Sequence, residues 1–330
     1  MPNSSEANAA IAALRQIARN EEYKACVARI PALRHVLLRA VSRFIGGEEL
    51  SECLQVARGL HQRGIATAID YMGESTRDRA RAALVTREFL RVIEALAARG
   101  SANSISPDLS HLGMAIDRQL AYENARALAG AALEAGTEVI LNMEGSERTE
   151  SILAIHRQLC ERYDNVGVTL QAYLHRTEQD LADAIARPGR IRLVKGAYAE
   201  PPSLARPLGP ATDAAFSALL ERLLASGHRC SIATHDAGLL EHAHRFIEGR
   251  GLLREPIEFE LNYGIAEDRL LHMQSLGYRV RVYLPYGEEW YLYLCHRLAE
   301  YPPNIYQALA DALSALPAIE TDGRSDVAGG

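Results

Sequence analysis

The stretch YLPYGEEWYLYLCHRLAEYPPN, residues 283–304, combines the end of a strand, a tight turn and a helix. A β-rich run that ends in a polar turn and leads into a helical pattern is typical of a βα unit. Spacing at i, i+3, i+4 and i+7 puts four polar side chains on one face of the predicted helix: Tyr293, His296, Arg297 and Glu300. Such a stripe is either a solvated face or part of a site, and the helix alone does not decide between them.

The same alternation of strand and helix extends back along the chain to about residue 64. The β-rich runs are ATAID (66–70), NSISPDL (103–109), EVILNM (138–143), GVTLQAY (167–173), IRLVKG (191–196), CSIATH (230–235), IEFELN (257–262) and RVRVYLP (279–285). Helical patterns such as 77–100 and 120–136 separate them. This order predicts an α/β fold with a parallel sheet, and eight such strands match a (β/α)8 TIM-type barrel. An open doubly wound sheet is the alternative, although no GxGxxG motif follows a strand.

The predicted domain organisation has three parts. Residues 1–63 read as an N-terminal helical segment, in which Gly46-Gly47 and Gly64 end helices. Residues 64–316 form the predicted barrel. Residues 317–330 are small and polar, and we expect them to be disordered.

Composition excludes several classes of protein. The net charge of −6 and the lack of a basic patch with interleaved aromatic residues argue against a nucleic-acid partner. No apolar run reaches the roughly 18 residues that a membrane span needs, and the first residues do not resemble a signal peptide. The 5 cysteines are scattered without a CxxC motif, which favours reduced thiols. We therefore expect a cytoplasmic protein, with peripheral attachment to a membrane left open.

In a (β/α)8 barrel the chemistry gathers at the carboxyl ends of the strands. The predicted strands end in a polar ring: Asp70, Ser106 to Asp108, Asn142, Glu144, Gln171, Lys195, Thr234 to Asp236, Glu260 to Asn262, and Tyr283. A catalytic metal is disfavoured because HExxH is absent and His235 next to Asp236 is weak ligand spacing. GxSxG is also absent. Lys195 is one of only two lysines, and Schiff-base, structural and cofactor-binding roles are all open to it.

Several motifs in this ring resemble one known family. They are RFIGGE (43–48), ATAIDYMGES (66–75), LNMEGS (141–146), IRLVKGAYAEP (191–201), SIATHDA (231–237), FELNYG (259–264) and RVYLPYGEEWYLYLCHRLAEYPPN (281–304). In this order and spacing they are similar to the motifs of the proline dehydrogenase family. The resemblance implies a distorted (β/α)8 barrel that holds FAD, with its last helix over the barrel mouth. It also implies oxidation of a C–N bond by hydride transfer to flavin N5.

The resemblance further implies a set of cofactor-binding residues. Arg192 corresponds to an arginine beside flavin N5, and Gln171 to a glutamine at the edge of the isoalloxazine ring. Glu300 corresponds to a glutamate that anchors the arginine and the flavin. The other implied contacts, along the flavin and its phosphates, are Val194, Lys195, Gly196, Ala197, Thr234 and His235. Tyr283 and Tyr293 correspond to the two tyrosines that wall the proline ring.

Four departures from the family pattern concern the substrate. His296-Arg297 stands where the family pairs two arginines on the carboxylate of proline. Asp108 aligns with a lysine that helps to bind this carboxylate, Asn142 with an aspartate, and Asn262 with an apolar residue. The site thus becomes about two charge units more negative, which disfavours a free carboxylate.

We therefore expect an FAD-dependent dehydrogenase that acts on an amine or amino acid other than free L-proline. Candidates are a modified or N-substituted amino acid, a hydrazine-like analogue and a prolyl group with a masked carboxylate. The alternatives are an ordinary L-proline dehydrogenase, a flavin-binding homologue without turnover, and a Schiff-base lyase that uses Lys195. A one-residue slip of the alignment at Pro107 would leave Asp108 outside the pocket. The electron acceptor, a quinone or oxygen, is undetermined.

Overall fold

The molecule is built on a closed barrel of eight parallel strands that pair in chain order, with β8 returning to β1. The computed structural model describes residues 13–14, 16–17, 20–97 and 103–300. Because β1 pairs with both β2 and β8, the sheet has no free edge. The predicted (β/α)8 barrel is confirmed, and the open sheet is excluded.

The strands lie close to where the sequence predicts them. They are β1 (Ala66–Tyr71), β2 (Ser104–Ile105), β3 (Glu138–Leu141), β4 (Val166–Gln171), β5 (Ile191–Val194), β6 (Cys230–Ala233), β7 (Ile257–Asn262) and β8 (Arg279–Tyr286). β2 is much shorter than the predicted run, because Pro107 has no N–H to donate to a neighbouring strand. The chain then enters a short π-helical turn, η1 (Ser110–Met114).

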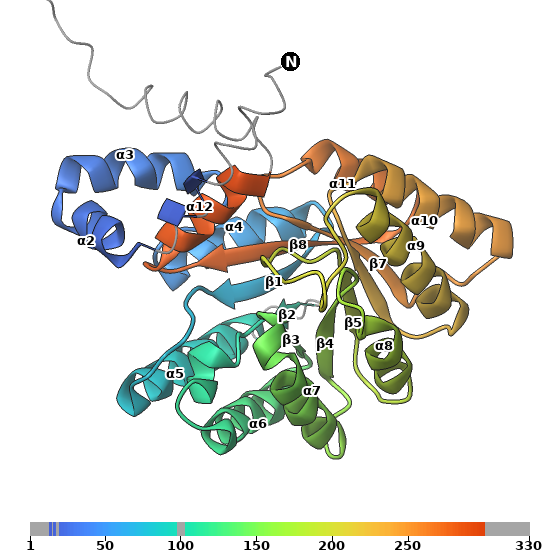
Figure 1. The fold of residues 1–330 in the computed structure, drawn as a ribbon, viewed down its shortest axis with the longest axis horizontal. Coiled ribbons are helices and arrows are strands. Elements are labelled where there is room, and N and C mark those ends of the chain that lie inside the picture. The colour runs from blue at the N-terminus through green and yellow to red at the C-terminus, as the bar shows by residue number, and fades with distance from the viewer. Residues whose placement is uncertain (1–12, 15, 18–19, 98–102, 301–330) are drawn as a thin grey trace, which may run out of the picture. The chain divides into compact units, whose positions relative to one another are not determined.

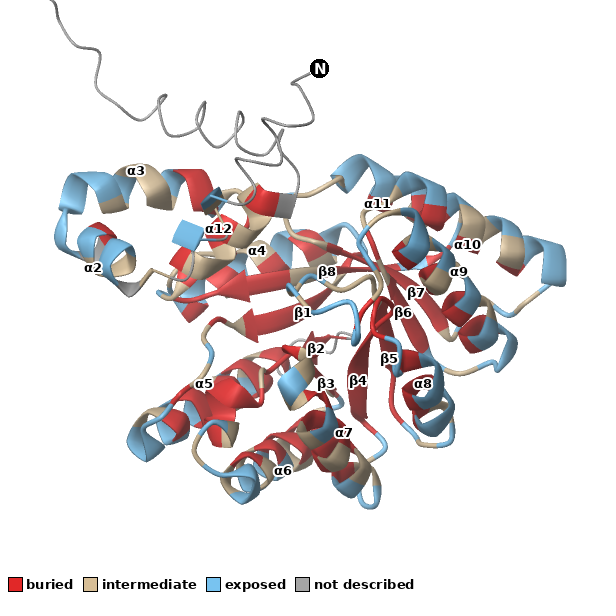
Figure 2. Cartoon of the chain, viewed as in Figure 1, coloured by how far each residue is buried: buried red, intermediate tan, exposed pale blue. Residues whose placement is uncertain are grey.

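Helices surround the barrel and bury their apolar faces on it (Figure 1). They are α4 (Leu50–Gln62), α5 (Arg79–Ala97), α6 (Arg118–Glu134), α7 (Ser146–Cys160), α8 (Thr177–Ile185), α9 (Pro210–Ala225), α10 (Ala237–Arg250) and α11 (Glu267–Ser275). Figure 2 shows the strands buried and the exposed residues on the outer faces of the helices. Parallel strands covered in this way are buried on both faces, as β4 is throughout its length.

Alternate residues of the strands point into the barrel and form two polar layers. We call the layer near the strand starts the amino-terminal layer and the layer near the strand ends the carboxyl-terminal layer. The amino-terminal layer contains Glu138, Arg190, Glu258 and Arg281. Two residues further along three of these strands, the carboxyl-terminal layer contains Arg192, Glu260 and Tyr283.

A second compact unit consists of residues 1–43 and 289–330, and the barrel unit covers residues 44–288. The described helices of this second unit are α2 (Glu21–Arg29), α3 (Pro31–Ser42) and α12 (Trp290–Glu300). Inside it, the guanidinium of Arg34 lies 6.0 Å from the ring centroid of Trp290. α4 belongs to the barrel unit, although the sequence placed it in the segment 1–63. The placement of α12 over the barrel mouth stays a prediction, and the tail 317–330 lies outside the described residues.

None of the helices within the described ranges is long and apolar enough to cross a membrane.

Candidate active site

Arg192 lies at the centre of the carboxyl-terminal layer and is only 3% exposed. Its Nε and Nη2 atoms bind the two oxygens of Glu260 at 3.0 and 2.9 Å. Its Nη1 atom donates to Ser106 Oγ at 2.7 Å, to Asn142 Oδ1 at 3.1 Å and to Thr169 Oγ1 at 3.3 Å. These four partners come from four parts of the barrel, so the guanidinium is fixed in one orientation.

Tyr283 connects Arg192 to a buried carboxyl group. Its hydroxyl donates to Asp70 Oδ2 at 2.7 Å and accepts from Asn142 Nδ2 at 3.2 Å. The guanidinium carbon of Arg192 lies 5.5 Å from the centroid of the tyrosine ring. Burial raises the pKa of Asp70 to about 7, although the bond from Tyr283 and the charge of Arg192 act in the opposite direction.

Asp108 follows β2 directly and faces the same group of residues. Burial raises its pKa well above the usual range, and the charges of Glu144 and Asp70 raise it further, whereas a hydrogen bond with Asn142 lowers it. Glu144 accepts a hydrogen bond from the backbone of Ser110 at 2.9 Å. The structure therefore places Asp108 in the polar ring at the strand ends, with other acidic groups around it.

Residues predicted to contact the cofactor line one side of this ring. Gln171 is buried at the end of β4, and its amide donates to the backbone oxygen of Glu144 at 2.8 Å. Gly196 has a φ of +111°, and a Cβ atom there would lie 2.2 Å from the ring of Tyr173. Only glycine can follow this path, because the ring of Tyr173 packs against the backbone there.

Lys195 lies between the first turns of two helices. It forms ion pairs with Asp213 of α9 and, at 3.6 Å, with Asp236. Asp236 caps α10 by accepting from the backbone of Gly238 and Leu239. A cation beside two helix N-termini is suited to bind phosphate groups, so this region fits the dinucleotide part of a flavin cofactor.

Two further predicted cofactor contacts, Thr234 and His235, directly follow β6. This strand pairs with β5, the strand that precedes Lys195. Thr234 accepts a hydrogen bond from the backbone N–H of Asp236 at 3.2 Å. The backbone oxygen of His235 accepts a hydrogen bond from Arg269. Asn262 ends β7, where it stands opposite Tyr283 in the register of the two strands.

The predicted polar stripe of α12 belongs to the second unit. The guanidinium carbon of Arg297 lies 5.0 Å from the ring centroid of Tyr293, so these two residues share a face as their spacing predicts. Tyr293, His296 and Arg297 are all half-buried. The side chain of Glu300 lies outside the described part of the chain, and the role of this stripe beside the barrel stays a prediction.

Two residues of the site had no predicted role. Glu260 belongs to the predicted polar ring, and it pairs with Arg192, an anchoring role that the family resemblance gave to Glu300. Tyr198 follows β5, where burial and the charges of Asp108 and Glu144 raise its pKa well above the usual range. It occurs inside a motif that the sequence already marked.

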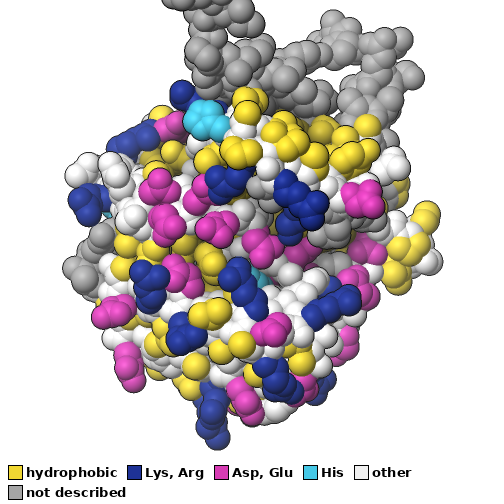
Figure 3. Space-filling model, turned by 90° about the vertical axis from the view of Figure 1, so that its left-hand side faces the viewer, with side chains coloured by type: hydrophobic (Ala, Val, Ile, Leu, Met, Phe, Trp, Pro, Cys, Tyr) yellow, Lys and Arg dark blue, Asp and Glu magenta, His cyan; other side chains and the backbone are white. Residues whose placement is uncertain are grey.

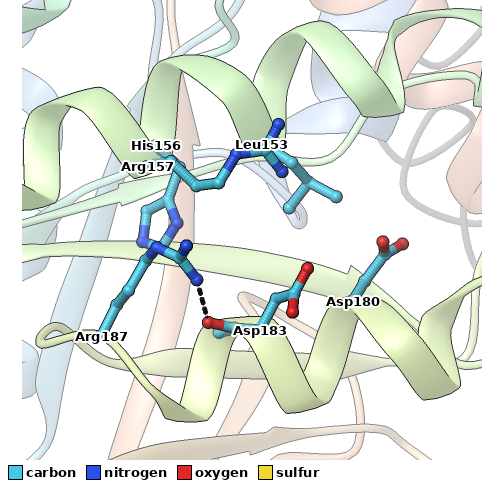
Figure 4. A pocket seen from close by; sticks show the side chains of 7 residues that line it. Leu153, His156, Arg157, Asp180, Asp183 and Arg187 are labelled. Atoms are coloured by element: carbon cyan, nitrogen blue, oxygen red, sulfur yellow. Dashed lines mark hydrogen bonds between the residues drawn. The ribbon is translucent and has the colours of Figure 1, made fainter.

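A small pocket between α7 and α8 (Figure 4) is lined by Leu153, His156, Arg157, Asp180, Asp183, Ala184 and Arg187. Arg187 donates there to the backbone oxygen of Asp183, and none of the predicted site residues lines the pocket. On the face shown in Figure 3, acidic and basic side chains are interspersed. The polar ring at the strand ends is therefore the candidate active site.

Comparison with known proteins gives matches to proline dehydrogenases. The profile of the proline dehydrogenase family matches residues 53–304. Proline dehydrogenase 2 of Bacillus subtilis is 33% identical over 266 residues, which are 81% of this chain and 88% of that protein. Proline dehydrogenase of Deinococcus radiodurans is 34% identical over 276 residues, 82% of this chain and 89% of that protein.

A solved structure supports the fold. Proline utilization A of Bdellovibrio bacteriovorus, inactivated by N-propargylglycine, superposes with a TM-score of 0.75 at 20% identity. The match covers 92% of this chain and 41% of that longer chain. Together with the barrel and the arrangement around Arg192, the sequence matches show that the chain belongs to the proline dehydrogenase family of flavin-dependent oxidoreductases.

Proposed function

We propose that the protein binds FAD and oxidises a C–N bond of a small secondary amine. The observation that carries this proposal is the fixed guanidinium of Arg192 in the barrel mouth, held by Glu260, Ser106, Asn142 and Thr169. A preorganised cation stabilises negative charge that arrives during a reaction, as it does when the flavin accepts a hydride. Membership of a flavin-dependent family supports the same role.

The remaining residues of the ring would hold the cofactor. Lys195 and the first turns of α9 and α10 would bind its phosphates, and the backbone around Gly196 would follow the flavin. Gln171 would meet the ring edge from β4. These assignments suit FAD because its pyrophosphate is anionic and its ring system is flat and needs close backbone approach.

We further propose that free L-proline is not the preferred substrate. Glu260 already balances Arg192, and Arg148 pairs with Glu144. Among the described residues, neither Asp70 nor Asp108 forms an ion pair. A substrate carboxylate beside these groups would oppose their ionisation, whereas a protonated amine would find carboxyl oxygens that accept its N–H bonds. N-substituted or hydrazine-like amino acids and prolyl groups with a masked carboxylate fit this charge pattern.

Ordinary L-proline dehydrogenase is the competing function. The two relatives that are 33 and 34% identical carry the name proline dehydrogenase. Arg297 would supply a carboxylate anchor if α12 covers the barrel mouth as predicted.

Anaerobic bleaching of the bound flavin separates these functions. The purified protein should be yellow, and L-prolinamide or pyrrolidine should reduce its flavin about tenfold faster than L-proline does, which corresponds to about 1.4 kcal/mol. If L-proline is the fastest amine, the ordinary function holds. Protein that neither contains FAD nor takes it up would refute both functions.

A further inference from the structure

We propose that Tyr283 and Asp70 form a proton relay that accepts the proton of the substrate's ammonium group before its C–N bond is oxidised. This inference rests on the proposed function, because it assigns a role within that reaction. An ammonium nitrogen has no lone pair with which to form a C=N bond. A dehydrogenase that takes up protonated amines therefore needs a group that removes this proton.

The hydrogen bonds around Tyr283 give the relay a direction. The amide oxygen of Asn142 accepts from Arg192 at 3.1 Å and from Ser106 Oγ at 3.0 Å, so this oxygen faces two donors. The amide nitrogen therefore points to the other side, where the backbone oxygen of Ser106, the hydroxyl of Tyr283 and Asp108 share its two hydrogens. The hydroxyl proton of Tyr283 goes to Asp70, whose Oδ2 atom lies 2.7 Å away and is the acceptor of this bond.

One position on the hydroxyl of Tyr283 is left for the substrate. A phenol oxygen donates one hydrogen bond and accepts up to two. Within the described residues, the donated bond goes to Asp70 and one accepted bond comes from Asn142. The second acceptor position can receive an N–H bond from an ammonium group. Tyr283 is half-buried and Asp70 is only 8% exposed, so a substrate meets the tyrosine before the carboxylate.

The surroundings suit Asp70 as a base near neutral pH. Burial raises the pKa of Asp70 to about 7, against the hydrogen bond from Tyr283 and the charge of Arg192. Asp108 faces it from the segment after β2. Cys53 faces it from α4 as a neutral thiol, because burial and the charge of Asp70 raise the pKa of this thiol. A base whose pKa lies near the working pH combines a large ionised fraction with a strong affinity for the proton.

The step balances in atoms and electrons. The N–H bond of the ammonium breaks as a new O–H bond forms on Tyr283, and the original hydroxyl proton moves to Asp70. The substrate becomes a neutral amine, and Asp70 becomes a neutral carboxylic acid. The neutral amine has the lone pair that a C=N bond needs, and FAD, when bound, would supply the acceptor for the hydride from the adjacent carbon. The net charge of the site with its substrate is unchanged, because one positive and one negative charge disappear together.

The test measures the rate of anaerobic flavin reduction against pH in the holoenzyme, with the amine that bleaches it fastest. In the wild type the rate should rise about tenfold per pH unit below about 7 and then level off. In Asp70→Asn this limb should disappear. At pH 8 the variant should be roughly 10²-fold slower, because only a small fraction of an amine with a lysine-like pKa of about 10.4 is then neutral. Its rate should keep rising at alkaline pH.

Two further variants sharpen the test. Tyr283→Phe should also lose the limb near pH 7, because the carboxylate is then cut off from the substrate. Asp108→Asn changes a neighbouring carboxyl group outside the relay, so it should keep the limb. Circular dichroism and flavin content show whether each variant is folded.

A second readout needs no substrate. Infrared difference spectra should show a protonated carboxyl group that titrates near pH 7, lost in Asp70→Asn and retained in Asp108→Asn. An unchanged limb in Asp70→Asn, or an infrared signal that this variant keeps, would overturn the relay while leaving the proposed function intact. If no amine reduces the flavin of the wild type, the proposed function fails and the relay fails with it.

Discussion

The two polar layers inside the barrel contain similar residues, but they differ in whether each carboxyl group is paired with an arginine. In the amino-terminal layer, Arg281 binds both oxygens of Glu258, at 2.7 and 3.1 Å, and Arg190 binds Glu138 at 3.0 Å. Each glutamate therefore has an arginine. In the carboxyl-terminal layer, Arg192 pairs with Glu260, and Asp70 forms no ion pair with any residue that the structure describes but accepts a hydrogen bond from the hydroxyl of Tyr283.

The pKa values follow from this difference in pairing. Burial alone would raise the pKa of Glu258, but the charges of Arg281 and Arg190 lower it to about 2. Burial also raises the pKa of Asp70, and there it prevails, to a value of about 7. Two carboxyl groups inside one barrel thus differ by about five pKa units. We conclude that pairing with arginine separates a carboxylate that stabilises the fold from one that can exchange a proton.

The largest effect is expected from breaking the amino-terminal layer. Glu258→Gln leaves Arg281 and Arg190 buried with one carboxylate fewer, so the free energy of unfolding should fall by about 3–5 kcal/mol. Urea denaturation at pH 7 measures this change. The matched control is Glu255→Gln, whose exposed side chain lies 3.6 Å from Arg279 and should contribute less than about 1 kcal/mol. Equal, small losses in both variants would contradict the assigned role of the layer.

At the carboxyl-terminal layer, we expect a substitution of the carboxylate to raise the free energy of unfolding rather than lower it. The pKa of Asp70 is about 7 in the folded protein and near 4 in the unfolded chain, so its ionisation costs stability as the pH rises between these values. Asp70→Asn removes this cost and should raise the free energy of unfolding at pH 8 by about 2–4 kcal/mol. At pH 4 the two proteins should be equally stable. Urea denaturation at both pH values decides, and a variant less stable than wild type at pH 8 would contradict the contrast.

Much of this comparison could be foreseen in the sequence, because it depends on periodicity. Strands that alternate with helices predict the barrel, and the rule that barrel chemistry lies at strand ends places Asp70 and Asp108 in one ring, whereas Arg192 was predicted from the family resemblance. The run 103–109 was predicted too long, since its apolar and polar residues continue beyond the two that pair in β2.

The sequence does not predict which arginine pairs with which glutamate inside the barrel. Glu258 and Glu260 both point inward from β7, and Arg190 and Arg192 both lie at β5, so the sequence allows several pairings. The strand register places Glu260 opposite Arg281 and Glu258 opposite Arg279, yet Arg192 meets Glu260 while Arg281 pairs with Glu258, so strand neighbours alone do not give the pairing. The pKa of Asp70 also depends on burial and on neighbours far away in the sequence, which no local pattern reports.

The smallest effect is expected from reversing the charge of the carboxyl-terminal layer toward that of the family. Asp108→Lys combined with His296→Arg supplies two cations for a substrate carboxylate and should raise L-proline turnover about tenfold, which needs only about 1.4 kcal/mol of transition-state binding. Asp108→Lys alone tests the barrel side, where this residue lies beside Asn142 and Glu144. His296→Arg alone tests the predicted position of α12 over the barrel mouth.

If both side chains meet one carboxylate, the two effects should not simply add, because each change alters the charge that the other meets. The measurement is kcat/KM for L-proline and L-prolinamide, and the gain should be confined to L-proline, since the amide has no carboxylate. A wild-type enzyme that already prefers L-proline, with no gain in the double variant, would show that the excess of acid serves the proton relay rather than substrate choice.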